Sequence, residues 1–488
     1  MIEKRRRTKM GLKEDLKREM RNATNDVAKE VEKHWMLDYE GHTIEISNKI
    51  MEETVKVDGE IIAQNMRKSI WSHIMPYSRL IGTFTGKSGK KHKVYVKIGG
   101  FVKLNLTVKV DGQKLLSDVQ SLQFLPWKNK AFILSYLGQQ FAEHGKLVTK
   151  ELPDDSFLYD ENHPKIEPGL ADQLVIEPVL PMYTKKLIKN FIQQVENPTD
   201  ETRKATYEKI NDEKVISYFH EFLVLFSEVE INDERMKKEA LWLLEHAAHR
   251  EVVKFALLVL GTTDCENIKE RLKILALHEE FTGVALFALS NGTRNANDAI
   301  WSIAKEVTDW GKVEALNFLE ADTEEMRLWF LTDGVENMIS GSHAPLMCAE
   351  KGKLDIQLHE DTVTNTIFDG VSKLIMALLY EGHYRLMDGY EYAGQVLMRY
   401  TKHAKVHCQT LHHFYVLTQI FNYVDEDDDI WEGRFNDNWK PHEKLAVEVA
   451  IQEISQHSQW LEEAKQLLEE DPAHIGAQAI VNFYQKKA

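Results

Sequence analysis

Two Asp-Gly turns, each preceded by the same strand-like run, place the strongest constraint on how this chain folds. The pentapeptide VKVDG occurs in TVKVDGEII at Thr54–Ile62 and again in TVKVDGQKL at Thr107–Leu115. Both central residues of a type I′ turn need a positive φ, which Asp-Gly supplies. The copies lie 53 residues apart, and their flanks do not align beyond the turn. The repeat therefore predicts two hairpins of one small β-domain rather than two domains.

The residues around these turns alternate between apolar and polar side chains. HTIEIS, KVYVKI and FVKLNLTVKV all show this pattern between Trp35 and Leu116. Period-two runs rich in Val, Ile and Thr are typical of half-buried antiparallel strands. The stretch GTFTGKSGKK, at Gly82–Lys91, looks like a phosphate loop but has only three residues before its Gly-Lys-Ser. A P-loop has four and opens a helix, so we predict a hairpin loop here.

Several motifs of this region resemble the β-domain of the Fas apoptotic inhibitory molecule family. The resemblance covers residues 35–116 and rests on Trp35, GHTIEI, VKVDGEII, Trp71, KVYVKI and LTVKVDGQKL. It implies a compact β-sandwich that serves as a binding or chaperone-like module, with no catalytic residues to transfer. The stretch Ile62–Ser78 departs from the family's pattern.

The second half of the chain repeats a helical pattern. VKFALLVLG from Val253, VALFALSNG from Val284 and VEALNFLEA from Val313 follow at intervals of 31 and 29 residues, and another apolar helical stretch precedes each. Paired helices at such a period are typical of an α-solenoid, in which stacking creates the core. The pattern resembles HEAT-like repeats over residues 236–340, which implies an extended surface for a partner.

These observations predict an α+β multidomain protein, with a small antiparallel β-sandwich followed by an all-α HEAT-like solenoid. We expect an amphipathic N-terminal helix with a basic arm over 1–33 and a β-sandwich domain with a capping helix over 34–150. A linker over 151–182 holds five of the eleven prolines, and the solenoid occupies 183–488. Proline interrupts regular structure, which places the main boundary in that linker.

Charge indicates the kind of partner. The net charge of −16 repels phosphate backbones, so we expect no nucleic-acid partner, and DNA repair by a HEAT-like solenoid would need a basic face. An acidic solenoid favours a basic protein or peptide. The basic run Lys4–Arg7 is either a solvated end or an arm that contacts acidic lipid or RNA. The oligomeric state is left open.

Composition also indicates where the protein works. No apolar run approaches the roughly 18 residues that span a bilayer, and no signal peptide is visible. The cysteines are Cys265, Cys348 and Cys408, which are far apart and odd in number. This usage suits a reducing cytosol, so we predict a cytoplasmic protein without a membrane span.

Histidine motifs raise the question of a metal site. His403 and His407 in TKHAKVHCQTLHHF are one helical turn apart and are the candidate metal ligands, although zinc needs three or four. HEEFT at His278 starts like a zincin helix but has Thr282 in place of the second histidine. The reversed motif EHAAH, at Glu245–His249, is equally incomplete.

The acidic run Asp425–Asp429 raises the question of calcium. An EF-hand that started at Asp425 would need Gly and Glu where Ile430 and Asn436 stand. A solvated loop is the simpler interpretation, and a docking patch for a basic partner is the alternative.

No motif for chemistry keeps the spacing that it needs, so catalytic and cofactor-binding residues stay unassigned and no cofactor is predicted. We predict a non-enzymatic, protein-binding scaffold that uses a solenoid surface and a β-module. The alternative is a monooxygenase-type oxidoreductase on a small hydrophobic substrate. The layout of the chain resembles a bacterial family that sometimes carries the label limonene hydroxylase, although no cofactor motif supports that activity. Whether the chain is an enzyme stays open.

Overall fold

The computed structural model describes residues 31–49, 52–66, 77–100, 103–121, 125–159, 164–174, 177–336, 342–380, 385–457 and 459–487. These residues fall into two compact units. The β unit comprises the described residues up to Ala131, with 153–165 and 199–208, and the helical unit comprises 132–152, 166–198 and 209 onward. The basic run Lys4–Arg7, the helix predicted before residue 31 and Trp71 lie outside the described residues.

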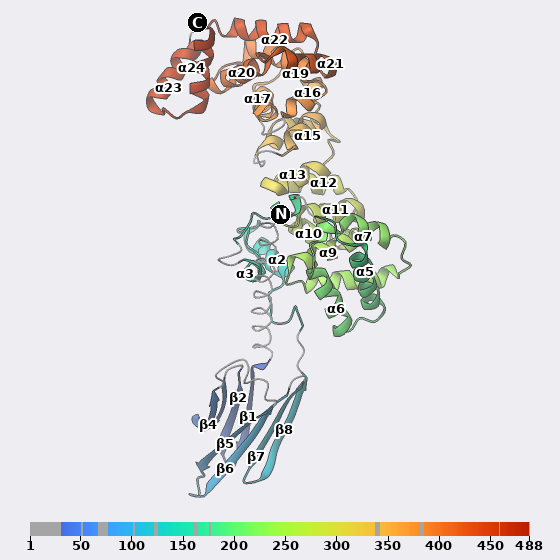
Figure 1. Cartoon of the computed structure of the whole chain (residues 1–488), viewed down its shortest axis with the longest axis vertical. Helices are drawn as coiled ribbons and strands as arrows, with labels where there is room; N and C mark the ends of the chain where they lie inside the picture. The colour runs from blue at the N-terminus through green and yellow to red at the C-terminus, as the bar shows by residue number, and fades with distance from the viewer. Residues whose placement is uncertain are drawn as a thin grey trace, which may run out of the picture. The chain divides into compact units, whose positions relative to one another are not determined.

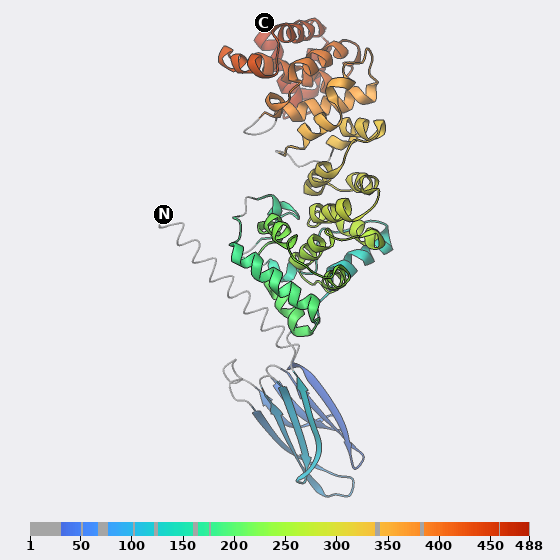
Figure 2. The same cartoon turned by 90° about the vertical axis from the view of Figure 1, so that its right-hand side faces the viewer.

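The β unit contains two four-stranded antiparallel sheets with the orders β1-β2-β3-β4 and β5-β6-β7-β8. Figures 1 and 2 show the strands of each sheet side by side. The strands are β1 (Lys33–Tyr39), β2 (His42–Asn48), β3 (Glu52–Val57), β4 (Glu60–Met66), β5 (Tyr77–Thr85), β6 (Lys91–Gly99), β7 (Lys103–Val110) and β8 (Gln113–Ser121). The strands predicted from alternation between Trp35 and Leu116 are thereby confirmed.

Apolar side chains from both sheets form one buried cluster. The first sheet supplies Ile44, Ile46, Val55 and Val57, and the second supplies Leu80, Val94, Val96, Ile98, Leu104, Leu106, Val108 and Val110. These residues alternate with more exposed ones along β2, β6 and β7, as the period-two pattern requires. The indole N–H of Trp35 in β1 donates to Asp118 Oδ2 in β8 at 2.7 Å, which links the two sheets.

Both VKVDG segments end in hairpin turns, as predicted. Asp58 and Gly59 have φ values of 49° and 87° and join β3 to β4, and Asp111 and Gly112 have 51° and 86° and join β7 to β8. The glycine-rich loop within Gly82–Lys91 joins β5 to β6, so the hairpin predicted in place of a phosphate loop is also confirmed.

The likeness of the two sheets extends well beyond the turns. His42 Nδ1 donates to Asp58 Oδ2 at 2.6 Å, and His92 Nδ1 donates to Asp111 Oδ2 at 2.8 Å. The backbone N–H of the residue after each histidine donates to the other oxygen of the same aspartate, in both cases at 2.8 Å. The strand register also shifts at matching places, between Val55 and Lys56 and between Val108 and Lys109. The two sheets therefore share the same turn, the same His–Asp hydrogen bond and the same shift in strand register.

Helices make up the regular structure that follows. The α-helices are α2 (Ile133–His144), α3 (Asp155–Leu158), α4 (Leu170–Gln173), α5 (Pro181–Glu196), α6 (Asp200–Asn211), α7 (Phe219–Phe226), α8 (Asp233–Glu245), α9 (Arg250–Leu260), α10 (Lys269–Ala276), α11 (Thr282–Gly292), α12 (Ala296–Ala304), α13 (Asp309–Phe318), α14 (Glu324–Leu331), α15 (Ala344–Lys351), α16 (Leu354–Gln357), α17 (Asn365–Tyr380), α18 (Leu386–Gly389), α19 (Ala393–His407), α20 (Leu411–Val424), α21 (Asp428–Asp437), α22 (Pro441–Ile454), α23 (Gln459–Glu470) and α24 (Ile475–Lys487). Three short 3₁₀ helices among the described residues are η2 (Val215–Ser217), η3 (Glu266–Ile268) and η4 (Asp333–Val335).

The helices between α8 and α15 pack as successive pairs. α8 packs on α9, α10 on α11, α12 on α13 and α14 on α15, while α9, α11, α13, α15 and α17 contact one another in order. The three aligned sequence segments form α9, α11 and α13, coloured light green to yellow in Figure 1. In each of the first three pairs, a side chain of the first helix donates a hydrogen bond to the backbone just after the second helix, and this hydrogen bond is called the clasp below. The side chains of Lys237, Lys269 and Asn297, on α8, α10 and α12, donate to backbone carbonyls after the partner helix, at Asp264, Arg294 and Glu320.

Helix α2 belongs to the helical unit rather than to the β unit that we expected it to cap. It packs on α8, α9 and α10, and the N–H of Ile133 donates to the carbonyl of Ala247 at 2.9 Å. Ile133 and Leu137 are fully buried there, because they complete the apolar surface of those helices. The predicted linker over 151–182 also contains structure, namely α3 and α4. None of the described helices is both long and apolar enough to cross a membrane.

Candidate functional site: an acidic pocket with aromatic walls

The site with the clearest chemical character is a pocket of about 480 Å³ in the helical unit, called the acidic pocket below. Segments far apart in the sequence build it: α4 and the residue before it, the start of α7, the turn before α11, α11 itself and α13. Its lining residues are Gly169, Asp172, Gln173, Ile216, Phe219, His220, Leu223, Glu279, Glu280, Gly283, Val284, Phe287, Trp310, Glu314 and Phe318. Four carboxylates thus share one cavity with four large aromatic rings.

Packing of α9, α11 and α13 brings the walls together, and the segment before α4 closes one side. Gly169 lies against the turn that precedes α11, where a Cβ would come within 2.8 Å of the carbonyl oxygen of Glu279. Its φ of 78° is also one that glycine adopts readily. The N–H of Gly169 donates to Glu280 Oε2 at 3.1 Å. The segment is therefore seated on the helices by close backbone contact.

A buried lysine pairs with two of the carboxylates that line the pocket. Lys254 on α9 is 1% exposed, and its Nζ lies 2.8 Å from Asp172 Oδ2 and 2.7 Å from Glu280 Oε1. Glu251, one turn earlier on the same helix, is 3.7 Å away. Arg250 adds a second cation at 3.5 Å from Glu280 Oε2. Three carboxylates thus surround one ammonium group that is itself almost completely buried.

This network shifts the pKa values of Glu280 and Glu251 in opposite directions. Burial alone would raise the pKa of Glu280, but Lys254, Arg250 and the Gly169 N–H lower it to about 2. Burial raises the pKa of Glu251 despite the nearby lysine, with Asp172 and Glu280 adding to the effect. Burial alone would lower the pKa of Lys254, yet the three carboxylates raise it well above its ordinary value. Glu280 and Lys254 are therefore a charged pair at neutral pH.

Two groups in the pocket lack the hydrogen bonds that buried polar atoms usually make. Asp172 Oδ1 and the indole Nε1 of Trp310 are both buried without a partner. Glu314 uses one oxygen, since Gln173 Nε2 donates to its Oε1 at 2.5 Å. Burial raises the pKa of Glu314, with the nearby Asp172 charge adding to the rise. The carboxyl group of Glu314 is therefore partly paired and is easier to protonate than an ordinary glutamate.

Aromatic side chains supply the apolar part of the pocket. Phe219 of α7 and Phe287 of α11 meet edge to face with ring centroids 5.2 Å apart. Trp310 and Phe318 lie one on each side of Glu314 in the sequence of α13, and all three line the pocket. Aromatic faces attract cations through the ring quadrupole, and carboxylates attract them by charge. The arrangement suits a ligand with an apolar stem and a positive end.

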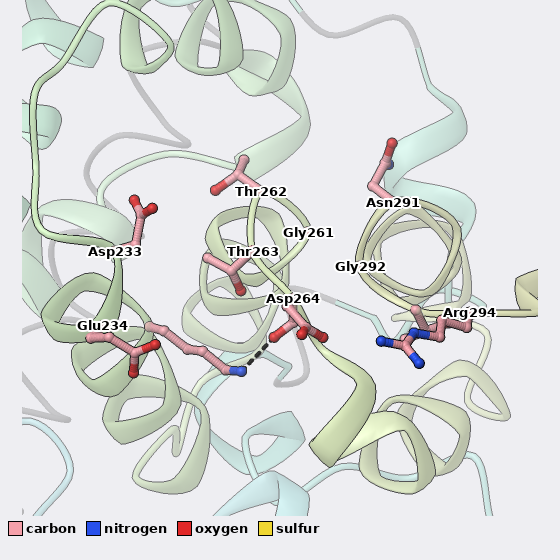
Figure 3. A pocket seen from close by; sticks show the side chains of 11 residues that line it. Asp233, Glu234, Gly261, Thr262, Thr263, Asp264, Asn291, Gly292 and Arg294 are labelled. Carbon is pink, nitrogen blue, oxygen red and sulfur yellow. Dashed lines mark hydrogen bonds between the residues drawn. The ribbon is translucent and has the colours of Figure 1, made fainter.

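A larger pocket of about 640 Å³ near the start of α8 has a different character (Figure 3). Its hydroxyl groups are engaged in capping helices: Thr262 Oγ1 donates to the carbonyl of Val259 at 2.7 Å, and Thr263 Oγ1 donates to that of Leu260 at 2.9 Å. Thr293 Oγ1 does the same for Leu289 at the end of α11. The three threonine hydroxyls of this pocket are thus engaged at the ends of α9 and α11.

The predicted metal ligands have separate partners. His403 Nε2 donates to the carbonyl of Leu358 at 3.0 Å, and His407 Nδ1 donates to Asn365 Oδ1 at 2.7 Å. Burial lowers the pKa of His407, with His403 and His413 adding to the effect. Among the residues that the structure describes, no group of three or more His, Cys, Asp or Glu side chains is placed to hold a metal ion.

The other sequence motifs fall at helix ends. His278 of HEEFT is buried between α10 and α11, while Glu245 and His249 of EHAAH lie at the end of α8 and just before α9. The acidic run Asp425–Asp429 connects α20 to α21 and enters the first turn of α21, where negative charge suits the helix dipole. Its Glu426 binds Arg434 at 2.7 Å and also Arg385, so part of the run is engaged internally.

Reasoning from the sequence missed the acidic pocket, although one signal lay in a motif that it singled out. HEEFT resembles a metal motif through its histidine, whereas the two carboxylates after it, Glu279 and Glu280, line the pocket. Asp172 stood in a segment interpreted as a linker. Comparison with known proteins adds no parallel: no protein-family model, curated protein or solved structure matches the chain.

Proposed function

We propose that the chain is a protein-binding protein whose acidic pocket receives a cationic side chain from a basic peptide or protein. One observation carries this proposal: four carboxylate side chains and four aromatic rings line one cavity. A cationic side chain would be attracted by the carboxylates while its apolar stem packs on the rings.

The apolar surface near the pocket supports docking of a larger partner. Ile216, which lines the pocket, is 39% exposed, and Val224 on α7 is 64% exposed. The N–H of Val179 donates to the carbonyl of Ser217 at 3.3 Å, which places the start of α5 beside η2. Leu180 and Met182 there are 78% and 80% exposed. Exposed apolar side chains around a charged pocket are typical of a protein interface.

The architecture that we propose fits this role. The shared buried cluster of the two sheets supports a β-sandwich like that of the Fas apoptotic inhibitory molecule family. The successive helix pairs and their repeated clasp support a HEAT-like solenoid. Such solenoids use a continuous helical surface for partners, and α11 and α13, which line the pocket, occupy equivalent positions in successive pairs.

An array of random dodecapeptides tests the proposal. The fluorescently labelled full chain is applied to basic, neutral and acidic members at physiological salt. We expect binding to members that combine a basic residue with apolar neighbours, and weaker binding by Glu314→Gln. The matched control is Glu325→Gln, which makes the same change at an exposed position on α14. Equal binding by the two variants, or a preference for acidic peptides, contradicts the proposal.

The monooxygenase alternative remains a separate prediction with its own test. The aromatic walls of the acidic pocket would also accept a small apolar molecule. The absorption spectrum and metal content of protein purified from its own cells would decide. A stoichiometric chromophore or redox metal would replace the binding proposal, and a small-molecule substrate would then be sought.

A further inference from the structure

We propose that the outward face of the second sheet, formed by β5, β6, β7 and β8 (Figure 1), binds the surface of a membrane that contains anionic lipid. This face is called the basic face below. It belongs to the β unit and has no part in the acidic pocket. Its charge, its breadth and its exposed apolar side chains all suit a lipid surface.

The charge of this sheet is opposite to that of the chain as a whole. Residues 77–121, which contain the sheet, include nine Lys or Arg and two Asp, a net charge of +7, whereas the whole chain has −16. Both aspartates are engaged within the β unit, because Asp111 accepts from His92 and Asp118 accepts from Trp35. Exposed charges farther away than a Debye length, about 8 Å at physiological ionic strength, are largely screened. The local charge therefore decides what this sheet attracts.

Seven of these cations lie on the outer face of the sheet. Side chains alternate between the two faces along each strand, and the apolar cluster occupies the inner face. Within the four strands, no Asp or Glu lies on the outer face. The cations on that face are Arg79 in β5, Lys91, Lys93 and Lys97 in β6, Lys103 and Lys109 in β7, and Lys114 in β8.

The first sheet of the β unit provides a comparison within the same chain. It shares the turn, the His–Asp hydrogen bond and the register shift with the second sheet. Its outer face nevertheless carries three carboxylates and one lysine, which are Asp38, Glu45, Glu52 and Lys56. The cations are therefore a property of the basic face and not a consequence of the fold that both sheets share.

The breadth of the basic face favours a plane of lipid headgroups over a single strand of nucleic acid. Neighbouring strands lie about 4.8 Å apart, so cations on four strands span roughly 14 Å across the sheet. A lipid surface can contact them all at once, whereas a polynucleotide follows one path and stacks its bases on aromatic rings. Here Tyr95 is partly buried, and Lys97 Nζ lies over the ring of Tyr77 at 4.1 Å from its centroid. The face thus offers few open rings to bases.

Exposed apolar side chains on the same face suit the acyl region beneath the headgroups. Ile81 in β5 and Val119 in β8 are 54% and 56% exposed. Ile81 pairs with Tyr95 and Val119 pairs with Asn105, which places both on the outer face among the cations. Binding to a lipid surface strengthens with the apolar area that is buried and with the attraction of anionic headgroups, and this face supplies both.

Co-sedimentation of the full chain with lipid vesicles tests the proposal. Vesicles of phosphatidylserine and phosphatidylcholine in equal parts are compared with vesicles of phosphatidylcholine alone at physiological salt. We expect binding to the anionic vesicles only, and weaker binding as the salt concentration rises. Absence of binding to the anionic vesicles, or equal binding to both kinds, overturns the proposal.

A triple variant locates the binding on the basic face. Lys91→Gln, Lys93→Gln and Lys109→Gln together should lower the partition coefficient for anionic vesicles about a hundredfold, roughly fivefold for each lysine. The same three lysines changed to arginine keep the charge and should keep the binding. Far-ultraviolet circular dichroism checks that both variants retain the fold of the parent.

Two controls separate the basic face from other cations of the chain. The matched variant makes the same three changes at exposed lysines on α5, namely Lys185→Gln, Lys186→Gln and Lys189→Gln, and should bind as the parent does. Deletion of the basic run Lys4–Arg7 should also leave binding unchanged. An equal loss in either control overturns the proposal. Binding of labelled polyuridylate by the parent, lost in the basic-face variant and without any vesicle binding, overturns it in favour of nucleic acid.

Discussion

At the scale of single residues, Lys254 holds together the buried charges beneath the acidic pocket. Replacing it by methionine keeps the apolar stem but leaves Asp172, Glu251 and Glu280 without their shared cation. We expect Lys254→Met to lower the free energy of unfolding by about 3–5 kcal/mol, the usual cost of uncompensated buried charge. Urea unfolding followed by circular dichroism measures this.

The exposed Lys189 on α5 supplies the control for that substitution. Lys189→Met should change the free energy of unfolding by less than about 0.5 kcal/mol, as surface substitutions usually do. A similar loss for both variants would mean that the Lys254 network contributes nothing specific.

Acid should reduce the contribution of Glu280 to the free energy of unfolding. The pKa of Glu280 falls from the ordinary 4.5 to about 2 on folding, so its stabilisation is present above about pH 4.5 and is lost as the pH approaches 2. The difference between the free energies of unfolding of the parent chain and of Glu280→Gln should therefore shrink as the pH falls from about 4.5 toward 2. Urea titrations at several pH values measure the difference, and a constant gap would contradict the assignment.

A second pH effect concerns binding at the acidic pocket. The raised pKa of Glu314 means that this carboxyl takes up a proton at a higher pH than an ordinary glutamate. Lysine and arginine keep their charge throughout that range, so affinity for a basic peptide should fall as the pH drops through the titration of Glu314. Fluorescence polarisation between pH 7 and pH 4.5 should show this fall in the parent chain and a smaller one in Glu314→Gln.

At the scale of elements, the two Asp-Gly turns need glycine because of its backbone conformation and not because a side chain would lack space. A Cβ at Gly59 or Gly112 would meet nothing within 4 Å, so the positive φ values of 87° and 86° are the cause of any penalty. We expect Gly59→Ala and Gly112→Ala each to reduce the free energy of unfolding by about 1–2 kcal/mol. Thermal unfolding followed by strand circular dichroism measures this.

Gly138 in the middle of α2 provides a control in which the same substitution should stabilise the protein instead of destabilising it. It also has open space around a Cβ, but its backbone is helical. Gly138→Ala should raise the free energy of unfolding by about 0.5–1 kcal/mol, because alanine is the better helix former. Destabilisation by all three substitutions would show that side-chain crowding, and not φ, limits these positions.

At the scale of the whole molecule, the β unit has a buried cluster of its own. Every residue of that cluster lies between Val31 and Leu116. We therefore expect a fragment of residues 31–121 to fold alone and to unfold cooperatively. Dispersed amide resonances and a sigmoidal urea transition would support this, and a spectrum typical of an unfolded chain would contradict it.

Features that arise from neighbouring residues could be predicted from the sequence, whereas features that join residues far apart in the sequence could not. The strands and the helices α9, α11 and α13 were predictable because alternation and helical periodicity are local signals. The acidic pocket was not, because its residues range from Gly169 to Phe318 and meet only through helix packing. The likeness of the sheets was missed because 16 residues separate His42 from Asp58, whereas 19 separate His92 from Asp111.

The matched His–Asp pairs and matched register shifts also bear on ancestry. Two sheets of one design within a single chain are what a tandem gene duplication leaves behind. A half-length ancestor would have had one apolar sheet face and nothing in its own chain to cover it, so it would have needed a second copy of itself. Fusion of two such copies would fix their stoichiometry and let each diverge, and a difference in the His–Asp separation, 16 residues against 19, is what such divergence would produce.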